Sequence, residues 1–473
     1  MSIYDPENFE DEFEGDSSPR KNDRDDIERF KEQLRTNENG IQNIEALEEI
    51  ISFYFEKEQY EEALVFATQL TDFAPYSSES WSKKGMLLNN LYRYDEAIET
   101  YNYAVSLNPT DSDIYINRGI TLDNANRNEE ALADFDYALI LDPGNDDALL
   151  NKAVTLEKLE RYSEAAEILQ RILKENPNHK DALFELGFCY DLMDKLEEAI
   201  KYYDLHINLE PYNHNAWYNR GIVLNRLGEF DRGISSYDMA LAIKEDFTAA
   251  LYNKGNVLAS IGKYDEAIEQ YKLTLQYEPK DVPALHNLGN TYEEMGNFTE
   301  AIKYFTLAVK YDNKHYESYF GRGSCYDALE QYRRALTDYN RALEICREYP
   351  ELWYAKADAE FNLGKLKESL MSYKMVVQLA PNNYEAWFDY GDSLFLAGYL
   401  RESLAALNKS IELKNTFADS FYCKAKVLFV MEKNAEAVEA LQQALALNRD
   451  LKKGLETDFK GIAQIKEFST LLQ

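Results

Sequence analysis

The chain has 473 residues, and its 85 Asp and Glu outnumber its 51 Lys and Arg, giving a formal net charge of −34. Nucleic acid and anionic lipid are therefore not expected as partners, because phosphate binding depends on Lys and Arg. Residues Met1 to Asn8 contain neither a basic region nor an apolar run typical of a secretory signal, and no stretch approaches the ~18–20 apolar residues of a membrane span. We expect a cytoplasmic protein without membrane insertion.

Residues 1–43 form an acidic N-terminal segment. Its first sixteen residues contain no basic group and seven acidic ones, namely Asp5, Glu7, Glu10, Asp11, Glu12, Glu14 and Asp16. This composition predicts a largely disordered tail. The charges then become mixed, and Asp25 to Leu34 is compatible with a short helix.

From Ile44 to Leu451, one 34-residue pattern occurs twelve times in unbroken register. Position 1 of each unit falls at Ile44, Ser78, Ser112, Asp146, Lys180, His214, Thr248, Val282, Tyr316, Pro350, Tyr384 and Ala418. Position 4 is large and apolar throughout, position 20 is Ala, Gly or Ser, and position 32 is Pro in seven units. A unit of this length cannot bury its own apolar face, so the units must stack on one another.

Two further positions show how the helices of one unit pack. Position 8 is small in eleven units: Gly85, Gly119, Ala153, Gly187, Gly221, Gly255, Gly289, Gly323, Ala357, Gly391 and Ala425. Position 24 is usually aromatic, as in Tyr101, Phe135, Tyr203, Tyr237, Tyr271, Phe305, Tyr339 and Tyr373. Small residues at positions 8 and 20 let two helices cross closely, and Pro at position 32 separates one helix pair from the next.

This pattern resembles the tetratricopeptide repeat, whose period is 34 residues. The resemblance covers residues 44–451, that is 408 of 473 residues. It implies an all-α fold, a right-handed solenoid of about twelve helix pairs, and a role as a protein-binding scaffold. Residues 452–473 are expected to supply a C-terminal capping helix, with Leu455, Phe459, Ile462, Phe468, Leu471 and Leu472 as its apolar residues.

The sequence shows no pattern typical of catalysis or of a cofactor. The cysteines Cys189, Cys325, Cys346 and Cys423 lie far apart without a CxxC pair, which argues against a metal site or a disulfide framework and agrees with a reducing compartment. The five histidines share no spacing typical of a metalloprotease or a triad, and no glycine-rich phosphate loop occurs. We therefore expect a protein that is not an enzyme. The abundance of Asn, Lys, Ile and Tyr is typical of an AT-rich bacterial coding sequence.

In the family, the first helix of each pair lines a concave groove, and helical periodicity places positions 2, 5, 6, 9, 12 and 13 on that side. Position 5 is aromatic or His from the fifth unit onward: Phe184, Tyr218, Tyr252, His286, Phe320, Tyr354, Phe388 and Tyr422. These rings either hold an extended ligand or pack against the first helix of the next repeat, and Tyr can do both because it has an apolar ring and a hydroxyl.

Asparagine recurs beside this stripe although it is a mediocre helix former. It occurs at position 6 as Asn117, Asn151, Asn219, Asn253 and Asn287, and at position 9 as Asn256 and Asn290. The arrangement is similar to the asparagine ladder in the repeat domain of O-GlcNAc transferase, which implies that these amides grip a peptide main chain. The alternative is inter-repeat hydrogen bonding. No transferase domain follows, so that activity is not implied.

The ladder has limits along the chain. Glu185 interrupts it, and it ends after the eighth unit, so the stripe and the ladder overlap in the sixth to eighth units. No position 5 is Lys, which makes the carboxylate clamp of chaperone-binding repeats improbable.

Charge on the expected groove indicates the partner. Apart from first-turn acids at position 2, which the helix dipole explains, its acids are Glu48, Glu49, Glu56, Asp123, Glu157, Glu185, Asp191, Glu293, Glu294, Asp327, Asp358, Asp389 and Asp392. Its basic residues are Lys83, Lys158, Arg226 and Lys426. We expect a scaffold that binds extended, basic or neutral peptide segments of other proteins. The alternatives are a self-assembly module acting through homo-oligomerisation and, less favoured, a regulatory subunit of an enzyme complex.

Overall fold

The computed structural model describes residues 44–459. Expectations for the acidic tail 1–43 and for Ile462, Phe468, Leu471 and Leu472 lie outside the described residues. Within 44–459 every regular element is a helix, which confirms the all-α prediction. None of these helices is long and apolar enough to cross a membrane.

The described part of the chain forms two compact units, unit 1 up to Met239 and unit 2 from Ala240, with their boundary inside α13 (Phe230–Ile243). The other helices of unit 1 are α2 (Ile44–Glu56), α3 (Tyr60–Phe73), α4 (Ser78–Asn90), α5 (Tyr94–Leu107), α6 (Ser112–Asn124), α7 (Asn128–Leu141), α8 (Asp146–Lys158), α9 (Tyr162–Glu175), α10 (Lys180–Leu192), α11 (Leu196–Leu209) and α12 (His214–Arg226).

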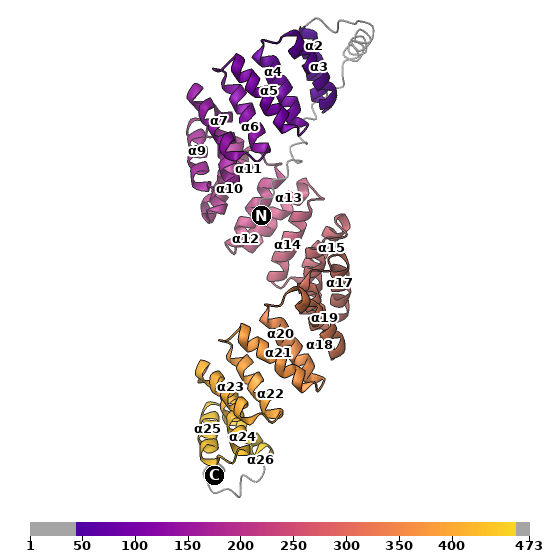
Figure 1. Cartoon of the computed structure of the whole chain (residues 1–473), viewed down its shortest axis with the longest axis vertical. Coiled ribbons are helices and arrows are strands. Elements are labelled where there is room, and N and C mark those ends of the chain that lie inside the picture. The colour runs from indigo at the N-terminus through magenta and orange to yellow at the C-terminus, as the bar shows by residue number, and fades with distance from the viewer. Residues whose placement is uncertain (1–43, 460–473) are drawn as a thin grey trace. The chain divides into compact units, whose positions relative to one another are not determined.

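Unit 2 continues the same alternation and ends with a 3-10 helix and a short α-helix (Figure 1). Its helices are α14 (Thr248–Ser260), α15 (Tyr264–Tyr277), α16 (Val282–Glu294), α17 (Phe298–Tyr311), α18 (Tyr316–Ala328), α19 (Tyr332–Ile345), α20 (Pro350–Asn362), α21 (Leu366–Leu379), α22 (Tyr384–Leu396), α23 (Leu400–Leu413), α24 (Ala418–Val430), α25 (Asn434–Leu447), η2 (Arg449–Gly454) and α26 (Leu455–Asp458).

Each repeat is one even-numbered first helix followed by one odd-numbered second helix, so the predicted helix pairs are confirmed. In every repeat the first helix begins at position 1 and the second at position 17. At eight of these helices the start is fixed by a cap, because a polar side chain at position 34 accepts a hydrogen bond from the first turn of the next helix, whereas Phe247, Tyr349 and Phe417 make no such bond. Such caps are made by Ser77, Asp111, Asn145, His179, Asn213, Asp281, His315 and Asn383.

The small residue at position 8 makes room for the ring at position 24 of the same repeat. A Cβ atom on Gly221 would lie 2.7 Å from the ring of Tyr237, and one on Gly289 would lie 2.7 Å from the ring of Phe305. These rings are almost fully buried. The glycine at position 321, where the asparagine ladder ends, is explained in a similar way, since a Cβ on Gly321 would lie 2.6 Å from the ring of Phe305 in the preceding repeat.

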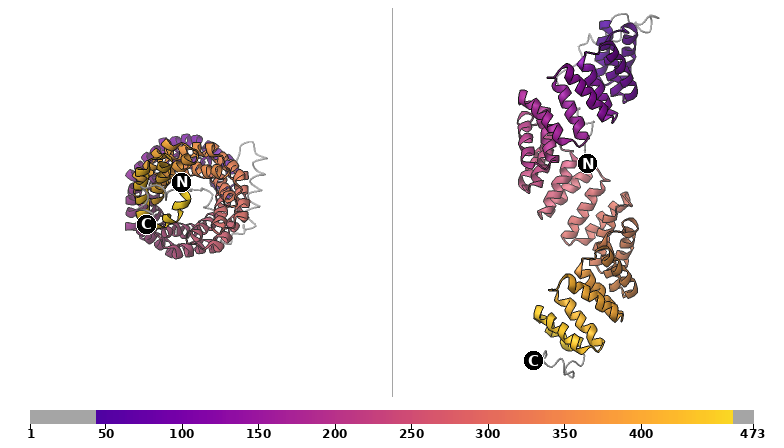
Figure 2. Two further views of the ribbon diagram at one scale, coloured as in Figure 1. Left: turned by 90° about the horizontal axis from the view of Figure 1, so that it is seen from below. Right: turned by 60° about the vertical axis from the view of Figure 1, so that its left-hand side comes forward.

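First helices also touch one another. In unit 1, α4, α6, α8, α10 and α12 contact in succession, and in unit 2, α14, α16, α18 and α20 do the same. Each unit therefore has a layer of first helices and a layer of second helices, which Figure 2 shows from two further sides. We call the outward side of the first-helix layer, formed by positions 5, 6, 9, 12 and 13, the first-helix face.

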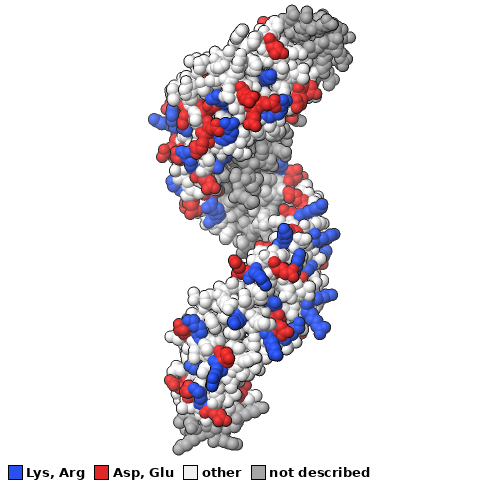
Figure 3. All heavy atoms as spheres, in the orientation of Figure 1, with Lys and Arg blue, Asp and Glu red and all other residues white. Residues whose placement is uncertain are grey.

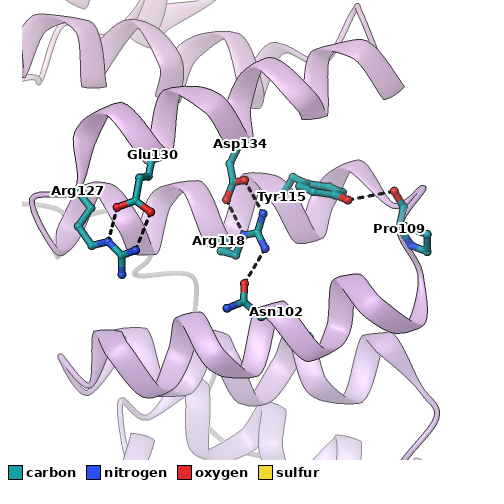
Figure 4. Close-up of polar contacts among 7 residues, drawn as sticks. All are labelled: Asn102, Pro109, Tyr115, Arg118, Arg127, Glu130 and Asp134. Carbon is teal, nitrogen blue, oxygen red and sulfur yellow. Dashed lines mark hydrogen bonds and ion pairs between the residues drawn. The ribbon is translucent and has the colours of Figure 1, made fainter.

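An arginine at position 7 bonds successive repeats within the layers. Arg118 donates hydrogen bonds to both carboxylate oxygens of Asp134, at 2.7 and 2.6 Å, and to Oδ1 of Asn102 in the preceding repeat, at 2.7 Å (Figure 4). Its guanidinium lies 5.3 Å from the ring centre of Tyr115. Arg322 repeats this arrangement in unit 2 with Asp338 and Thr306.

At the C-terminal end of the described residues, two of the six expected capping residues are placed. Leu455 and Phe459 are buried against the last repeat, and Phe459 forms edge contacts with Tyr422 and Phe429.

Candidate peptide-binding surface

The position-5 rings lie on the first-helix face and are half-buried from Phe184 to Phe388. Most of their ring partners are position-24 rings of the same repeat, and some also pack toward the first helix of the next repeat, as Phe184 does in a cluster that includes Val223 on α12. The pairs are Phe184–Tyr203, Tyr218–Tyr237, Tyr252–Tyr271, His286–Phe305, Phe320–Tyr339 and Tyr354–Tyr373, with ring centres 5.6 to 6.1 Å apart. One side of each ring is therefore packed while part of it stays exposed.

The stripe ends earlier than the sequence predicts. Phe388 packs on Phe417, and Tyr422 is buried, with its hydroxyl donating to Asp458 at 2.9 Å and its ring against Phe459. Tyr422 is thus covered by the chain itself. The sequence could not show this contact, because the residues after Leu451 do not follow the 34-residue pattern.

Hydroxyl groups of the stripe reach the next repeat. The Tyr252 hydroxyl accepts a hydrogen bond from Nδ2 of Asn287 at 2.9 Å, and the Tyr354 hydroxyl donates to Asp389. In both cases a position-5 residue bonds to the position-6 residue that follows it by 35 residues. The rings thus contribute both to the face and to the joint between repeats.

Several ladder asparagines bond within the protein. Asn287 Nδ2 also donates to Oδ1 of Asn256 at 2.8 Å, and the Tyr271 hydroxyl donates to the same oxygen at 2.8 Å. Asn151 donates to the carbonyl of Asp147 in its own helix at 2.8 Å. The inter-repeat alternative thus describes Asn287 and Asn256 in this structure, and their grip on a peptide stays a prediction.

The remaining members of the ladder lie on the same face. Asn117, Asn219 and Asn253 are half-buried, and Asn219 lies near the buried hydroxyl of Tyr203. Unit 1 holds Asn117, Asn151 and Asn219, whereas Asn253, Asn256, Asn287 and Asn290 belong to unit 2. The sixth to eighth repeats, in which the stripe and the ladder overlap in sequence, therefore include the unit boundary.

His286 takes part in a polar chain on α16 and α18. Its Nε2 lies 3.0 Å from Nδ2 of Asn290, its Nδ1 lies 3.1 Å from Oγ of Ser318, and that hydroxyl lies 2.9 Å from Nδ1 of His315. Since an amide can only donate through nitrogen, His286 Nε2 is the acceptor and Nδ1 carries the proton. Burial, and then the neighbouring His315, lower the pKa of His286 to about 4, so the ring is neutral near pH 7.

In unit 1, all three groove cations identified from the sequence are already paired with acids of the neighbouring repeat. Lys83 bonds to Glu48 at 2.6 Å, Lys158 bonds to Asp123 at 2.6 Å, and Arg226 pairs with Asp191. Each pair is 35 residues apart, a spacing that could have been read from the sequence. These acids are therefore not free to select a basic partner.

The carboxylates of unit 2 have different surroundings. Glu293 accepts a hydrogen bond from Ser324 at 2.7 Å, Asp358 accepts one from the Tyr373 hydroxyl, and Asp389 accepts one from Tyr354. Desolvation is the main cause that raises the pKa of Glu293, Asp327 and Asp389, and it raises the pKa of Asp358 to about 6. Within residues 44–459, none of these four forms an ion pair with Lys or Arg.

No group of three or more His, Cys, Asp or Glu among the described residues is arranged to hold a metal ion. Cys189, Cys325 and Cys423 are buried, and burial is the main cause that raises the pKa of each thiol.

Stacked two-helix repeats of this kind define a helical-repeat protein of the protein-interaction class. Family models of the tetratricopeptide repeat match residues 78–111, 100–133, 125–178, 158–218, 282–348 and 354–416, and a family model described as TPR repeat matches residues 255–296. Together these matches cover more than half of the chain, which belongs to the tetratricopeptide repeat family.

Solved structures of similar fold each correspond to part of the chain. The C-terminal part of a TPR repeat-containing protein from Cytophaga hutchinsonii is 18% identical, covering 50% of this chain and 97% of that one with a TM-score of 0.45. YrrB, described as a TPR protein with an unusual peptide-binding site, is 24% identical over 39% of this chain and 94% of its own, with a TM-score of 0.37. MamA is 27% identical over 34% of this chain and 95% of its own, with a TM-score of 0.33. A search of the curated proteins found no match.

Proposed function

We propose that the protein is a scaffold that binds an extended segment of another protein along the first-helix face. Tetratricopeptide repeats in general support protein interaction, and the finer assignment rests on one observation. The face carries half-buried rings whose packing on position-24 rings fixes their orientation, so a ligand can bury their remaining surface without ordering them first. Rigid aromatic anchors of this kind dominate the energetics of interfaces.

The preference for basic or neutral segments rests on charge. The acids of this face outnumber its cations, and three of the four cations are engaged in ion pairs within unit 1. An acidic segment would meet like charges without compensation, which disfavours binding.

Peptides selected from a random displayed library on the immobilised protein provide the test. The double variant Tyr252→Ala, Phe320→Ala is expected to lose at least about tenfold in affinity for the selected peptides, because two anchoring rings are removed. Fluorescence anisotropy measures the affinity, and a thermal melt checks that the variant is folded.

The matched control is Tyr277→Ala, Tyr311→Ala, which removes two exposed rings from the second helices α15 and α17. This variant should bind with unchanged affinity. Equal losses in both variants would contradict binding at the first-helix face.

A further inference from the structure

Position 12 of several repeats holds a carboxylate whose surroundings differ between the two units. In unit 1 the residues are Asp123, Glu157 and Asp191, and in unit 2 they are Glu293 and Asp327. Two of the unit 1 carboxylates bind a cation supplied by position 13 of the following repeat. Nζ of Lys158 lies 2.6 Å from Asp123, and Arg226 pairs with Asp191. The geometry of this face therefore places a Lys or Arg head group against a position-12 carboxylate.

The corresponding cations are missing in unit 2. Position 13 of the following repeat is Ala328 beside Glu293 and Asn362 beside Asp327. Asp327 is half-buried, and its Oδ1 is a buried atom with no hydrogen-bond partner among the described residues. An unpartnered buried carboxylate oxygen is costly, so it indicates a group that is supplied from elsewhere.

Two more carboxylates extend this row along the first-helix face. Asp358 lies on α20 and Asp389 on α22, and they are linked through Tyr373 and Tyr354, whose hydroxyls donate to them and whose ring centres lie 5.8 Å apart. The negative charges of Asp389 and Asp327 also contribute to the raised pKa of Asp358. Their hydrogen-bond donors are tyrosine hydroxyls, which do not neutralise a negative charge. We call Glu293, Asp327, Asp358 and Asp389 the unpaired carboxylate row.

Apolar surface runs beside the row. Phe320 precedes Asp327 by seven residues on α18, and Tyr354 precedes Asp358 by four on α20, so each ring shares a helix face with a carboxylate. Both rings are half-buried. A Lys or Arg side chain suits such a surface, because its methylene stem covers a ring while its charged end reaches an acid.

Positive charge in this part of the chain is concentrated on the second helices. In Figure 3, Lys and Arg gather over α17 and α19. Lys303, Lys310, Arg333 and Arg341 are exposed there. None of these cations, and no other Lys or Arg among residues 44–459, forms an ion pair with a member of the row.

We propose that the unpaired carboxylate row binds Lys or Arg side chains of an extended protein segment, in the way that Asp123 and Asp191 bind Lys158 and Arg226 in unit 1. The inference rests on the proposed peptide-binding function and names its ligand class and its place. The row lies in repeats 8 to 11, and a bound cation would compensate carboxylates that are desolvated and have no counter-charge within residues 44–459.

The test installs the missing cations. In the double variant Ala328→Lys, Asn362→Lys, the new side chains should occupy Glu293 and Asp327 as Lys158 occupies Asp123. The full chain, as variant and as wild type, is titrated at physiological salt with a capped, fluorescent octalysine peptide as the probe. We expect its affinity to fall at least about tenfold below that for the wild type.

The charge-matched control is Gln276→Lys, Gln378→Lys, which adds the same charge to exposed residues of α15 and α21. It should weaken binding much less. A size control, Ala328→Gln with Asn362→Gln, should bind as the wild type does. Equal loss in the two lysine variants would show that only net charge matters and would overturn the proposal.

Carbodiimide labelling of carboxylates with glycine ethyl ester localises the peptide. Octalysine should protect Asp358 and Asp389 more than the exposed Asp265 and Glu266 of α15, and equal protection would overturn the proposal. Displacement of octalysine by spermidine at equal amine concentration would overturn its assignment to a peptide ligand.

The outcome is separable from that of the proposed function. Suppose that the library-selected peptides lack Lys and Arg, that their binding depends on Tyr252 and Phe320, and that the installed lysines do not change it. The scaffold function would then stand, and this inference would be overturned. Failure of the aromatic variants to change any affinity would overturn both.

Discussion

The guanidinium group of Arg118 joins three helices of unit 1, because it bonds to Asp134 on α7 and Asn102 on α5 from its own place on α6. Asp134 is buried, so removing its partner leaves a carboxylate with an uncompensated charge. We expect Arg118→Ala to lower the free energy of unfolding by about 3 kcal/mol, the lower end of the range for broken buried pairs, since Arg118 keeps some exposure. Urea unfolding measures the loss, and hydrogen exchange of α6 and α7 localises it.

Arg127→Ala is the matched control in the same repeat. Arg127 forms two hydrogen bonds with Glu130, at 2.8 and 2.7 Å, but both side chains are exposed (Figure 4). Solvent-exposed pairs contribute little to stability. A loss as large as that of Arg118→Ala would contradict the assignment of a structural role to burial of the pair.

The sequence predicts contacts that depend on residue size better than contacts that depend on side-chain reach. Gly at position 8 and an aromatic residue at position 24 recur in the same repeats, and their steric fit is what the structure shows. Arg118 is different, because its partners lie 16 residues before and after it. They are Asn102 and Asp134 around Arg118 but Thr306 and Asp338 around Arg322. When the bonding partner changes identity between repeats, the sequence shows no recurring residue type at that position.

The turn between the two helices of a repeat contains one residue in the left-handed backbone conformation. Position 15 has positive φ in all twelve repeats, and glycine occupies it in five of them, including Gly262 with φ +78°. A Cβ added to Gly262 would meet nothing within 4 Å, so a substitution there meets only backbone strain. We expect Gly262→Ala to lower the free energy of unfolding by about 1 kcal/mol, as measured by urea unfolding.

Gly144 provides the control for this element. It lies between α7 and α8 without positive φ, and an added Cβ would meet only the Asp142 side chain, at 4.0 Å. Gly144→Ala should therefore be neutral or slightly stabilising, because alanine reduces the entropy of the unfolded chain. A larger loss at Gly144 than at Gly262 would contradict the role of the left-handed conformation.

At the scale of helices, the predicted phase of the repeat was confirmed because local signals coincide with it. Capping side chains such as Ser77 and Asp111 precede position 1, and the ring at position 24 fixes the crossing of the pair. The candidate surface was less predictable. Whether the Tyr252 hydroxyl faces a ligand or Asn287 depends on side-chain rotamers in two repeats, and helical periodicity says nothing about them.

The whole molecule contains several carboxyl groups that are easier to protonate when it is folded. Burial raises the pKa of Glu157 to about 7 and that of Asp358 to about 6, and it raises the pKa of Glu185, Glu293, Asp327 and Asp389. The unfolded values are near 4, so the folded state binds more protons between about pH 4 and 7 and stability falls as pH rises through that window. His286, whose folded pKa is lowered, contributes in the opposite direction.

Glu157→Gln separates the local effect from the repulsion of the net charge of −34. The variant should unfold at a higher urea concentration than the wild type at pH 8, with a smaller difference at pH 5, because glutamine avoids burying a charge. Addition of 0.5 M salt screens surface repulsion but should leave this difference in place. The exposed Glu167→Gln is the control, and an equal gain from it would contradict an effect of burial.

The side-chain pairs 35 residues apart have a consequence for the history of the chain. Removing one whole repeat, residues 146–179, would preserve the helical register but would bring Leu192 to the place where Lys158 now meets Asp123. Other junctions are equally individual, with Glu48 matched to Lys83 and Tyr354 to Asp389. Repeats of equal length are therefore not interchangeable: duplication or loss of a unit during evolution would have required new matching residues on both sides of the joint.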